Sequence, residues 1–260
     1  MTDAFDLKRY ELFGWDYPLV CPVTDEEAGW YELWARRAGG PVLGLACGTG
    51  RLLCRLAAAG FETVGLDLSE GMLRLARGFV AELPAGVQRR VRLVRGDMCE
   101  FDIGRRFPLI LIADNSFRHT AERADLLRCL ACVRGHLAEG GTLLITERRF
   151  DPSKFPGGRR QYGWSEPRRH PETHESVSRR IETRISPDGR RMLGTMIYKT
   201  IGADGSETID QCRFDTLVLT VPQYVELFAE AGFETRLCVG YEQRDDDGAD
   251  PILCFVCRAG

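Results

Sequence analysis

A glycine-rich turn followed by a single acidic residue is the segment of this sequence whose spacing best suits ligand chemistry. An apolar run leads into the turn ACGTG (residues 46–50), a helical pattern follows, and Asp67 ends the next apolar run. Glycines let the backbone approach a ligand closely, and the first turn of a helix presents N–H groups that have no intrahelical partner. A carboxylate about twenty residues further on can accept hydrogen bonds from ribose hydroxyls. The whole unit favours a nucleoside-binding site over a structural turn with a surface aspartate.

The same spacing argues against a nicotinamide dinucleotide as the ligand. A dinucleotide-binding turn has a third glycine where this chain has Leu53. The chain also lacks the Tyr-x-x-x-Lys arrangement of many dehydrogenases, because Tyr198 and Lys199 are adjacent. A dehydrogenase is therefore the weaker enzyme hypothesis.

Alternating strand and helix patterns must position this turn. Short apolar runs separated by helical patterns indicate crossover connections and a parallel sheet. The expected strands are 41–46, 61–66, 91–94, 109–113 and 142–146. The expected helices are 24–38, 51–59, 70–81 and 120–137, with Thr24, Ser69 and Thr120 as N-terminal caps.

After Glu147 the pattern becomes that of an antiparallel sheet. Residues 151–172 are rich in Pro, Gly and Arg and are expected to form a loop; alternating segments with turn sequences between them follow at 177–185, 191–201 and 207–219. The first pattern then returns, with a helix at 221–231 and strands at 233–239 and 252–257. We therefore expect an α/β protein with a Rossmann-like, seven-stranded, mostly parallel sheet. Residues 1–150 and 221–260 form this domain, and residues 151–220 form an inserted antiparallel lobe.

Composition narrows the classes of function. Of the 260 residues, 44% are hydrophobic and 28% are charged, as in ordinary soluble globular proteins. A net charge of -3 argues against a nucleic-acid partner. No apolar run approaches the length of a membrane helix, and the N-terminus lacks a signal peptide, so a cytoplasmic location is expected. The ten cysteines are then expected to be reduced, and the two Cys-x-x-Cys pairs lie in helix and strand patterns that do not suit a metal.

The stretch LACGTG, with Asp67 and then Gly96-Asp97, resembles the class I S-adenosylmethionine-dependent methyltransferases from about residue 41 to 147. The resemblance implies S-adenosyl-L-methionine as the cofactor and a small molecule as the methyl acceptor. It also implies which residues hold the cofactor: the loop along the methionine part, Asp67 on the ribose diol, and further residues around the adenine and beyond the fourth strand. The full set of these positions is Ala46, Cys47, Gly48, Gly50, Asp67, Leu68, Met72, Asp97, Met98 and Asp114. One departure is Gly44, where the family usually has an acid that helps to hold the methionine ammonium.

Two finer signals resemble the glycine and sarcosine N-methyltransferase group. NSF-x-H (residues 115–119) follows the fourth strand, and Arg148 follows the fifth. The resemblance implies that Asn115 and His119 lie near the reacting groups, with His119 as the candidate base, and that Arg148 binds a substrate carboxylate. A guanidinium fork suits that task, since it pairs with a carboxylate through two hydrogen bonds. The group's Asn and Tyr after this arginine are Arg149 and Phe150 here, which departs from its pattern.

The sequence leaves the acceptor open. The favoured reaction is transfer to the amine of a small carboxylate-bearing compound, by in-line displacement at the sulfonium methyl. A small-molecule O-methyltransferase and a non-catalytic relative that binds S-adenosylmethionine remain alternatives. Tyr17, Tyr162 and Trp164 lie in loops that could cover a substrate, and no metal is expected. Antiparallel lobes of this kind often mediate dimers, so a homodimer is the candidate assembly.

Overall fold

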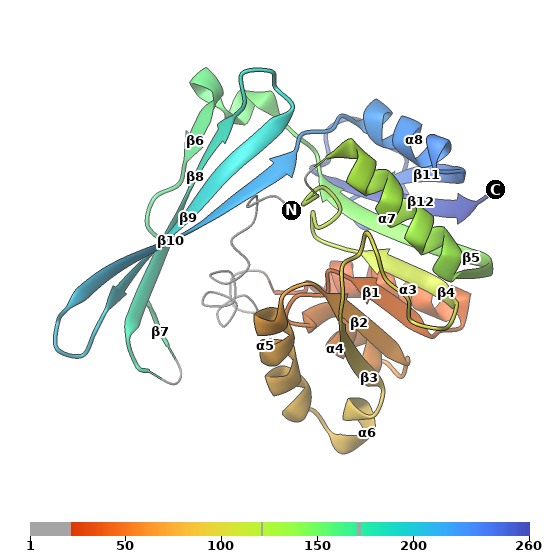
Figure 1. The fold of residues 1–260 in the computed structure, drawn as a ribbon, viewed down its shortest axis with the longest axis horizontal. Coiled ribbons are helices and arrows are strands. Elements are labelled where there is room, and N and C mark those ends of the chain that lie inside the picture. The colour runs from red at the N-terminus through yellow and green to blue at the C-terminus, as the bar shows by residue number, and fades with distance from the viewer. Residues whose placement is uncertain (1–21, 121, 171–172) are drawn as a thin grey trace.

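Two β-sheets organise the protein (Figure 1). The computed structural model describes residues 22–120, 122–170 and 173–260, and Tyr17 lies outside this part. The first sheet has seven strands in the order β11-β12-β5-β4-β1-β2-β3, and the second has β10-β9-β8-β6 with β7 paired to β8.

The seven-stranded sheet is parallel except for one strand, β12. Its members are β1 (Val42–Leu45), β2 (Thr63–Asp67), β3 (Val91–Arg95), β4 (Phe107–Ile112), β5 (Leu137–Arg148), β11 (Phe233–Val239) and β12 (Ile252–Ala259). The strand β12 runs antiparallel to both of its neighbours, β5 and β11. β1 lies at the centre between β2 and β4, and every residue of β1 is buried, because helices cover both faces. The predicted Rossmann-like sheet with an inserted antiparallel sheet is confirmed.

Helices pack on the two faces of this sheet and form two apolar clusters. On one face α3 (Asp25–Ala38) and α4 (Arg51–Ala58) pack through residues such as Tyr31, Trp34 and Leu56. On the other face α7 (Arg123–His136) and α8 (Val221–Glu230) pack through residues such as Leu130 and Phe228, on the viewer's side of the sheet in Figure 1. α5 (Glu70–Ala81) lies beside β2 and β3, and the short α6 (Ala85–Gln88) follows it.

The caps explain where several helices begin. Thr24 caps α3, with its Oγ1 accepting a hydrogen bond from the Glu27 N–H at 3.1 Å. Ser69 caps α5 in the same way, with its Oγ accepting from the Met72 N–H at 3.2 Å. Both caps were predicted. The predicted cap at Thr120 is wrong, because α7 begins at Arg123 with Glu122 as its cap and a reciprocal bond to Asp125.

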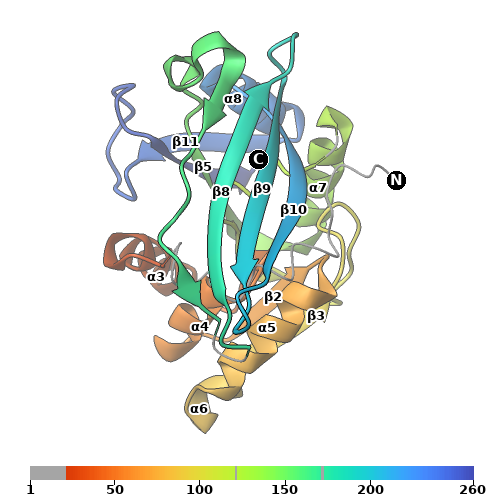
Figure 2. The same cartoon turned by 90° about the vertical axis from the view of Figure 1, so that its left-hand side faces the viewer.

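The inserted lobe is a twisted antiparallel sheet, which Figure 2 shows with its outer face turned to the viewer. Its long strands β8 (Ser176–Ile185), β9 (Arg191–Ile201) and β10 (Glu207–Leu217) match the three predicted segments closely. The region 151–172 is not wholly loop, because β6 (Arg159–Gln161) and β7 (Arg168–Arg169) pair with β8 and two 3₁₀ turns, Pro152–Lys154 and Pro156–Gly158, precede them. The lobe is joined to the loop after β4 by a hydrogen bond from the Leu217 N–H to the Arg118 carbonyl at 3.1 Å.

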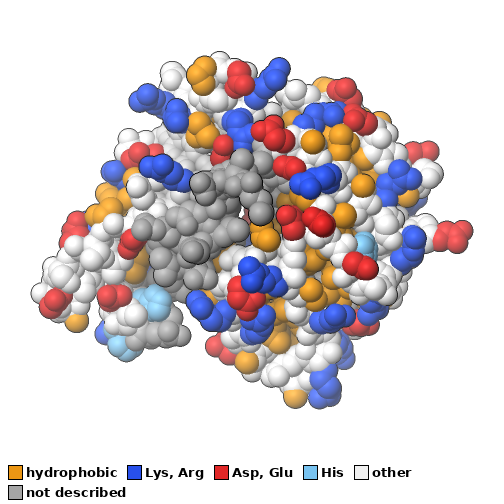
Figure 3. Space-filling model, in the orientation of Figure 1, with side chains coloured by type: hydrophobic (Ala, Val, Ile, Leu, Met, Phe, Trp, Pro, Cys, Tyr) orange, Lys and Arg blue, Asp and Glu red, His pale blue; other side chains and the backbone are white. Residues whose placement is uncertain are grey.

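The surface carries both signs of charge. On the face that Figure 3 shows, basic and acidic side chains are interspersed, and no single-sign field covers it. No helix in the described ranges combines the length and the apolar character needed to cross a bilayer. The cysteines of both Cys-x-x-Cys pairs lie within regular elements, α7 and β12, and residues 22–120, 122–170 and 173–260 contain no cluster suited to a metal ion.

Candidate functional site

The glycine-rich loop leaves β1 at the carboxyl edge of the sheet and turns directly into α4. Three residues adopt left-handed backbone conformations, with φ of 49° at Ala46, 56° at Gly48 and 73° at Gly50. The Gly50 N–H donates to the Cys47 carbonyl at 2.9 Å, and the Cys47 N–H donates to the Leu66 carbonyl at 3.0 Å. Ala46 carries a steric penalty that a glycine would avoid, because its Cβ crowds the backbone in this conformation. The predicted loop is therefore tightly folded, and it lies against the end of β2.

Asp67 ends β2 and holds this loop. Its Oδ2 accepts a hydrogen bond from the Gly48 N–H at 2.7 Å, and its Oδ1 accepts one from the Ser69 N–H at 2.9 Å. The residue is 9% exposed. Burial raises the pKa of the carboxyl, and the hydrogen bonds from Ser69 and Gly48 oppose that change. The structure thus brings the predicted acid and the predicted loop into direct contact.

Gly44 has a packing reason to lack a side chain. A Cβ at this position would lie 2.9 Å from Cδ2 of Leu53, and a Cβ at Gly65 in the neighbouring strand would lie 2.6 Å from Cδ1 of the same leucine. Leu53, which stands where a dinucleotide turn has glycine, therefore fills the space over both strands. A side chain at position 44 would therefore require the end of the Leu53 side chain to shift.

The residues predicted around the adenine lie at the ends of β2 and β3. Leu68 is 44% exposed beside Asp67, whereas Met72 is buried and its Cε lies 3.6 Å from where a Cβ on Gly48 would be. Asp97 is exposed, and its Oδ1 accepts a hydrogen bond from the Cys99 N–H at 2.8 Å. Met98 is half-buried against the core. Burial raises the pKa of the Cys47 thiol well above its usual value, so this cysteine is a neutral loop residue rather than a nucleophile.

Asp114 follows β4 and forms an ion pair that the sequence did not indicate. Its Oδ2 accepts a hydrogen bond from Arg51 Nη2 at 2.7 Å, and Arg51 Nη1 lies 3.9 Å from Oε2 of the buried Glu27. Burial raises the pKa of Glu27, and the Arg51 guanidinium opposes that change. α3, α4 and β4 therefore meet in a charged contact next to the glycine-rich loop.

Asn115 is fixed by two donors at the same edge. Its Oδ1 accepts a hydrogen bond from the Arg148 N–H at 2.7 Å and another from Arg118 Nη2 at 3.0 Å. Asp114 and Asn115 have φ of 54° and 65°, a left-handed conformation that these two residue types tolerate better than most. The side chain of Arg148 is exposed, and no residue in the described ranges forms an ion pair with it. The structure thus places the predicted Asn115 and Arg148 side by side.

A buried ion pair beneath Asn115 was also missed. Arg118 Nε lies 3.2 Å from Oε2 of Glu147, and the two residues are 8% and 2% exposed. Burial raises the pKa of Glu147 to about 7, while Arg118 and the Tyr224 hydroxyl act in the opposite direction. The only sequence signal was a glutamate at the end of the apolar run TLLITE (residues 142–147).

His119 lies next to this pair and is half-buried, with its ring centroid 6.5 Å from that of Phe214 in the lobe. Desolvation, with a contribution from the Arg118 charge, lowers the pKa of His119 to about 4. The imidazole is therefore neutral near pH 7. A neutral imidazole can accept a proton, but such a low pKa makes it a weak base.

The predicted lobe aromatics lie outside this cluster of contacts. Tyr162 and Trp164 are about two-fifths exposed. Arg160 lies 4.4 Å from the centre of the Tyr162 ring, and Arg180 lies 5.0 Å from a ring centre of Trp164. Within the described ranges, both aromatics pack against cations of their own lobe.

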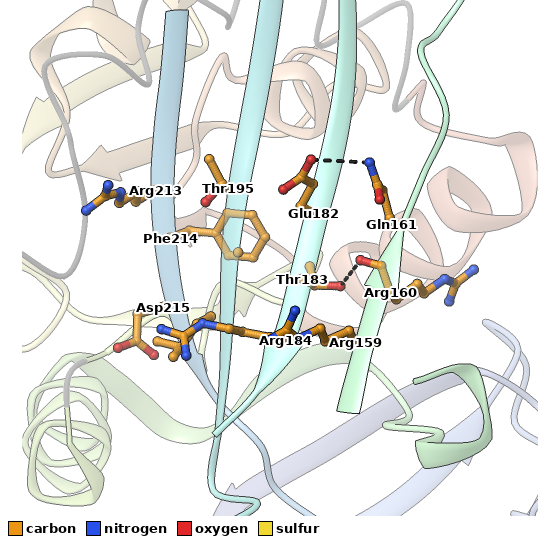
Figure 4. A pocket seen from close by; sticks show the side chains of 12 residues that line it. Arg159, Arg160, Gln161, Glu182, Thr183, Arg184, Thr195, Arg213, Phe214 and Asp215 are labelled. Carbon is orange, nitrogen blue, oxygen red and sulfur yellow. Dashed lines mark hydrogen bonds between the residues drawn. The ribbon is translucent and has the colours of Figure 1, made fainter. Parts of the chain in front are cut away.

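The lobe has a hollow of about 760 Å³ that is distinct from the loop site. Figure 4 shows the side chains around it, and the ring of Phe214 lies across β9 there, over Gly194. Its lining residues are Arg159, Arg160, Gln161, Glu182, Thr183, Arg184, Leu193, Gly194, Thr195, Arg213, Phe214 and Asp215. None of the predicted cofactor or substrate residues is among them, so we do not assign the transfer site to this hollow.

The donor set at the carboxyl edge suits S-adenosylmethionine. The chain offers a carboxylate for a ribose diol at Asp67, apolar contacts at Leu68 and Met72, and backbone of a tight loop at residues 46–50. The hydroxyl of Thr49 in this loop is buried, and no hydrogen-bond partner for it lies in the described part of the chain. These groups match a nucleoside with a short polar extension.

Comparisons with known proteins agree with this geometry. A family model described as a methyltransferase domain matches residues 42–141. The chain is 30% identical over 202 residues to the dTDP-3-amino-3,6-dideoxy-alpha-D-glucopyranose N,N-dimethyltransferase of Streptomyces fradiae, covering 76% of this chain and 72% of that protein. A glycine/sarcosine N-methyltransferase of Parasynechococcus marenigrum is 31% identical over 159 residues, 58% of this chain and 54% of that protein. The sugar N-methyltransferase KedS8 of Streptoalloteichus shares the fold, with a TM-score of 0.73, 23% identity and coverage of 96% of this chain and 93% of KedS8.

The likeness to the Streptomyces fradiae protein covers about three quarters of this chain. The family-model match covers the glycine-rich loop, Asp67, Asp97 and Asp114. The predictions of a methyltransferase and of S-adenosyl-L-methionine as its cofactor are confirmed. The chain belongs to the class I S-adenosylmethionine-dependent methyltransferases.

Proposed function

We propose that this enzyme methylates the amine of a sugar that carries an anionic group, such as a nucleoside diphosphate. The observation that carries the proposal is the exposed Arg148 beside Asn115, at the carboxyl edge of a chain related to a nucleotide-sugar N,N-dimethyltransferase. Arg148 supplies a cation for the anionic part of the acceptor, since guanidinium groups bind phosphate and carboxylate well. Asn115 lies next to it, where it can contact the reacting amine.

The residues of the carboxyl edge then have distinct tasks. Residues 46–50, Asp67, Leu68, Met72, Asp97, Met98 and Asp114 are proposed to hold S-adenosylmethionine, which supplies an electrophilic methyl group when bound. Asn115 and Arg148 orient the acceptor, and such placement accounts for about 7–11 kcal/mol of barrier reduction in favourable cases. A neutral His119 can receive the proton that the amine loses, although release to solvent serves the same end.

The second candidate is a small amino acid as the acceptor. It is favoured by the sequence NSF-x-H at residues 115–119 and by Arg148, which suits a carboxylate as well as a phosphate. The relative that points this way matches over a smaller share of both chains than the sugar N,N-dimethyltransferase does. We therefore place the amino sugar first.

A two-stage experiment tests the proposal. Calorimetric titration with S-adenosylhomocysteine compares the unaltered protein with Asp67→Ala, and Asp245→Ala serves as a control on an exposed acid. Binding that is lost only in Asp67→Ala supports the assigned cofactor site. Methyl transfer is then measured with nucleotide-linked amino sugars, with glycine and sarcosine, and with hydroxyl acceptors. Turnover of the amino sugars alone supports the proposal, turnover of the amino acids favours the second candidate, and turnover of hydroxyls refutes an amine acceptor.

Assembly and location remain predictions. A homodimer through the antiparallel lobe is checked by sedimentation of the purified protein, which gives a monomer mass if the prediction is wrong. A cytoplasmic location is checked by fractionation of the source cells.

A further inference from the structure

Glu147 is an unusual residue to find at the end of a buried strand. The preceding residues of β5, Thr142 to Thr146, are all buried, and Glu147 itself is 2% exposed. A carboxyl group without access to water is costly unless a partner compensates it. An apolar residue would pack at this position without that cost. The buried carboxyl group therefore indicates a specific partner nearby.

That partner is Arg118, which comes from the loop after β4. Its Nε lies 3.2 Å from Glu147 Oε2, and the guanidinium is itself buried. The backbone of Arg118 is also held, because its carbonyl accepts the hydrogen bond from the Leu217 N–H of β10. Arg118 is thus fixed at its backbone by the lobe and at its side chain by β5.

The other end of the same guanidinium reaches Asn115. Arg118 Nη2 donates to Asn115 Oδ1 at 3.0 Å, and the Arg148 N–H donates to the same oxygen at 2.7 Å. A flipped amide would place its NH₂ group against two donors, so only one orientation satisfies these contacts. The amide nitrogen is then directed to the Asp114 side, where it lies 3.4 Å from Oδ1.

We propose that Glu147 and Arg118 are positioning residues for methyl transfer, acting through the side chain of Asn115. The proposal rests on the proposed function, in which Asn115 contacts the reacting amine. Neither residue touches the acceptor. The carboxylate of Glu147 lies 3.2 Å from Nε of the buried guanidinium and compensates its charge. The guanidinium in turn donates to the amide oxygen of Asn115, whose backbone is in a left-handed conformation. Removing the carboxylate leaves a buried guanidinium without its counter-charge, so the guanidinium turns toward water and releases Asn115.

The chain offers a direct probe, because Asn115 is its single asparagine. Selective ¹⁵N-asparagine labelling therefore gives one side-chain NH₂ signal in a two-dimensional NMR spectrum. Glu147→Leu keeps the approximate volume of the side chain and removes the carboxylate, whereas Glu147→Gln keeps a polar oxygen beside the guanidinium without the charge. Glu230→Leu is the control, since it breaks another Arg–Glu pair, with Arg123, on the exposed side of α7 and α8.

The NH₂ signal is expected to move in Glu147→Leu and to stay near its original position in Glu147→Gln and Glu230→Leu. The kcat of Glu147→Leu is expected to fall by about 10–100-fold, as for a small misplacement of a reacting group, with Glu147→Gln recovering most of it. The Kd for S-adenosylhomocysteine is expected to stay within about twofold, which also shows that the variant is folded. Arg118→Met, tested in the same way, repeats the loss without changing Glu147.

Two results overturn the proposal. One is an unmoved NH₂ signal in a folded Glu147→Leu, and the other is a moved signal with unchanged kcat. If Glu147→Leu does not fold, Arg118→Met decides by the same two measurements. Absence of turnover by the unaltered protein with every acceptor counts against the proposed function instead, and the asparagine signal then still decides whether Glu147 and Arg118 position Asn115.

Discussion

The buried carboxyl of Glu147 makes the free energy of unfolding depend on pH in a defined way. Its pKa is about 7 in the folded protein against 4.5 for an ordinary glutamate. Between these values the folded chain keeps a proton that the unfolded chain has released, so stability falls as pH rises from 4.5 to about 7. Each pH unit between the two pKa values is worth about 1.4 kcal/mol, so the effect amounts to roughly 3 kcal/mol across that window.

His119 acts in the opposite direction over nearly the same range. Its pKa is about 4 in the folded protein and 6.5 ordinarily, so the unfolded chain binds the extra proton. Its contribution to stability is therefore lost as pH falls from 6.5 to about 4. The two groups change the free energy of unfolding with pH in opposite directions, so their effects partly cancel in the unaltered protein.

Glu147→Gln separates the two effects, because it removes one titrating group and keeps the shape. Urea unfolding is followed by circular dichroism from about pH 4.5 to about pH 8, for the unaltered protein and for the variant. The variant is expected to gain roughly 3 kcal/mol relative to the unaltered protein as pH rises through this window. The reasoning is refuted if the difference between the two curves is independent of pH, or if the variant loses stability relative to the unaltered protein.

Three further substitutions test separate parts of the structure. Ala46→Gly relieves a φ of 49° and is expected to raise stability by about 0.5 kcal/mol in urea unfolding. The control Ala131→Gly, at an exposed position inside α7, is expected to lower stability by about 0.5–1 kcal/mol. Equal losses in the two variants would contradict the strain argument. Gly194→Ala puts a Cβ 1.9 Å from the Phe214 ring and is expected to cost about 1–3 kcal/mol in the same assay, with no such loss when Phe214→Leu is also present. Arg148→Met is expected to raise the KM for an anionic acceptor by about 10–100-fold in steady-state kinetics, as for a lost charged hydrogen bond. The Kd for S-adenosylhomocysteine should not change, and a weaker Kd with an unchanged KM would place Arg148 on the cofactor instead.

The main architecture was predictable because each element carries its own local signal. β8, β9 and β10 alternate in the strand manner between turn sequences, and their predicted bounds agree with the structure to within two residues. β6 and β7 have only three and two residues, so they have no period of their own and exist through pairing with β8. The sequence predicted a helix as far as residue 137 and a strand only from residue 142, but β5 begins at Leu137. Its pairing with β4 shifts register between Leu137 and Thr142, so Gly140 and Gly141 lie in an irregularity within the strand.

The sequence predicted where the residues of the candidate site lie, but it did not predict which side chains contact one another there. Asp67 was expected opposite the loop because a strand, a turn and a helix fix that spacing, and its bond to the Gly48 N–H agrees. Nothing in the sequence around residue 118 indicates that Arg118 faces inward to the distant Glu147, since that contact depends on how the loop after β4 lies over β5. Leu53 is a similar case, because its role over Gly44 and Gly65 appears only when two strands and a helix are assembled.

The missed contacts have a common physical origin in the parallel sheet. Strands that run in one direction end at one edge, so the polar residues that follow β4 and β5 converge there with those at the starts of α3 and α4. The resulting series of contacts is Glu27, Arg51, Asp114, Asn115, Arg118 and Glu147. Its charged members alternate in sign, so removing one of them weakens the compensation of the charge on its neighbour. Substitutions of two neighbouring members of such a series break the same contact, and their effects on stability and turnover are therefore not additive. The exposed pair Arg123–Glu230 has no member in common with the series, so its loss is expected to add independently.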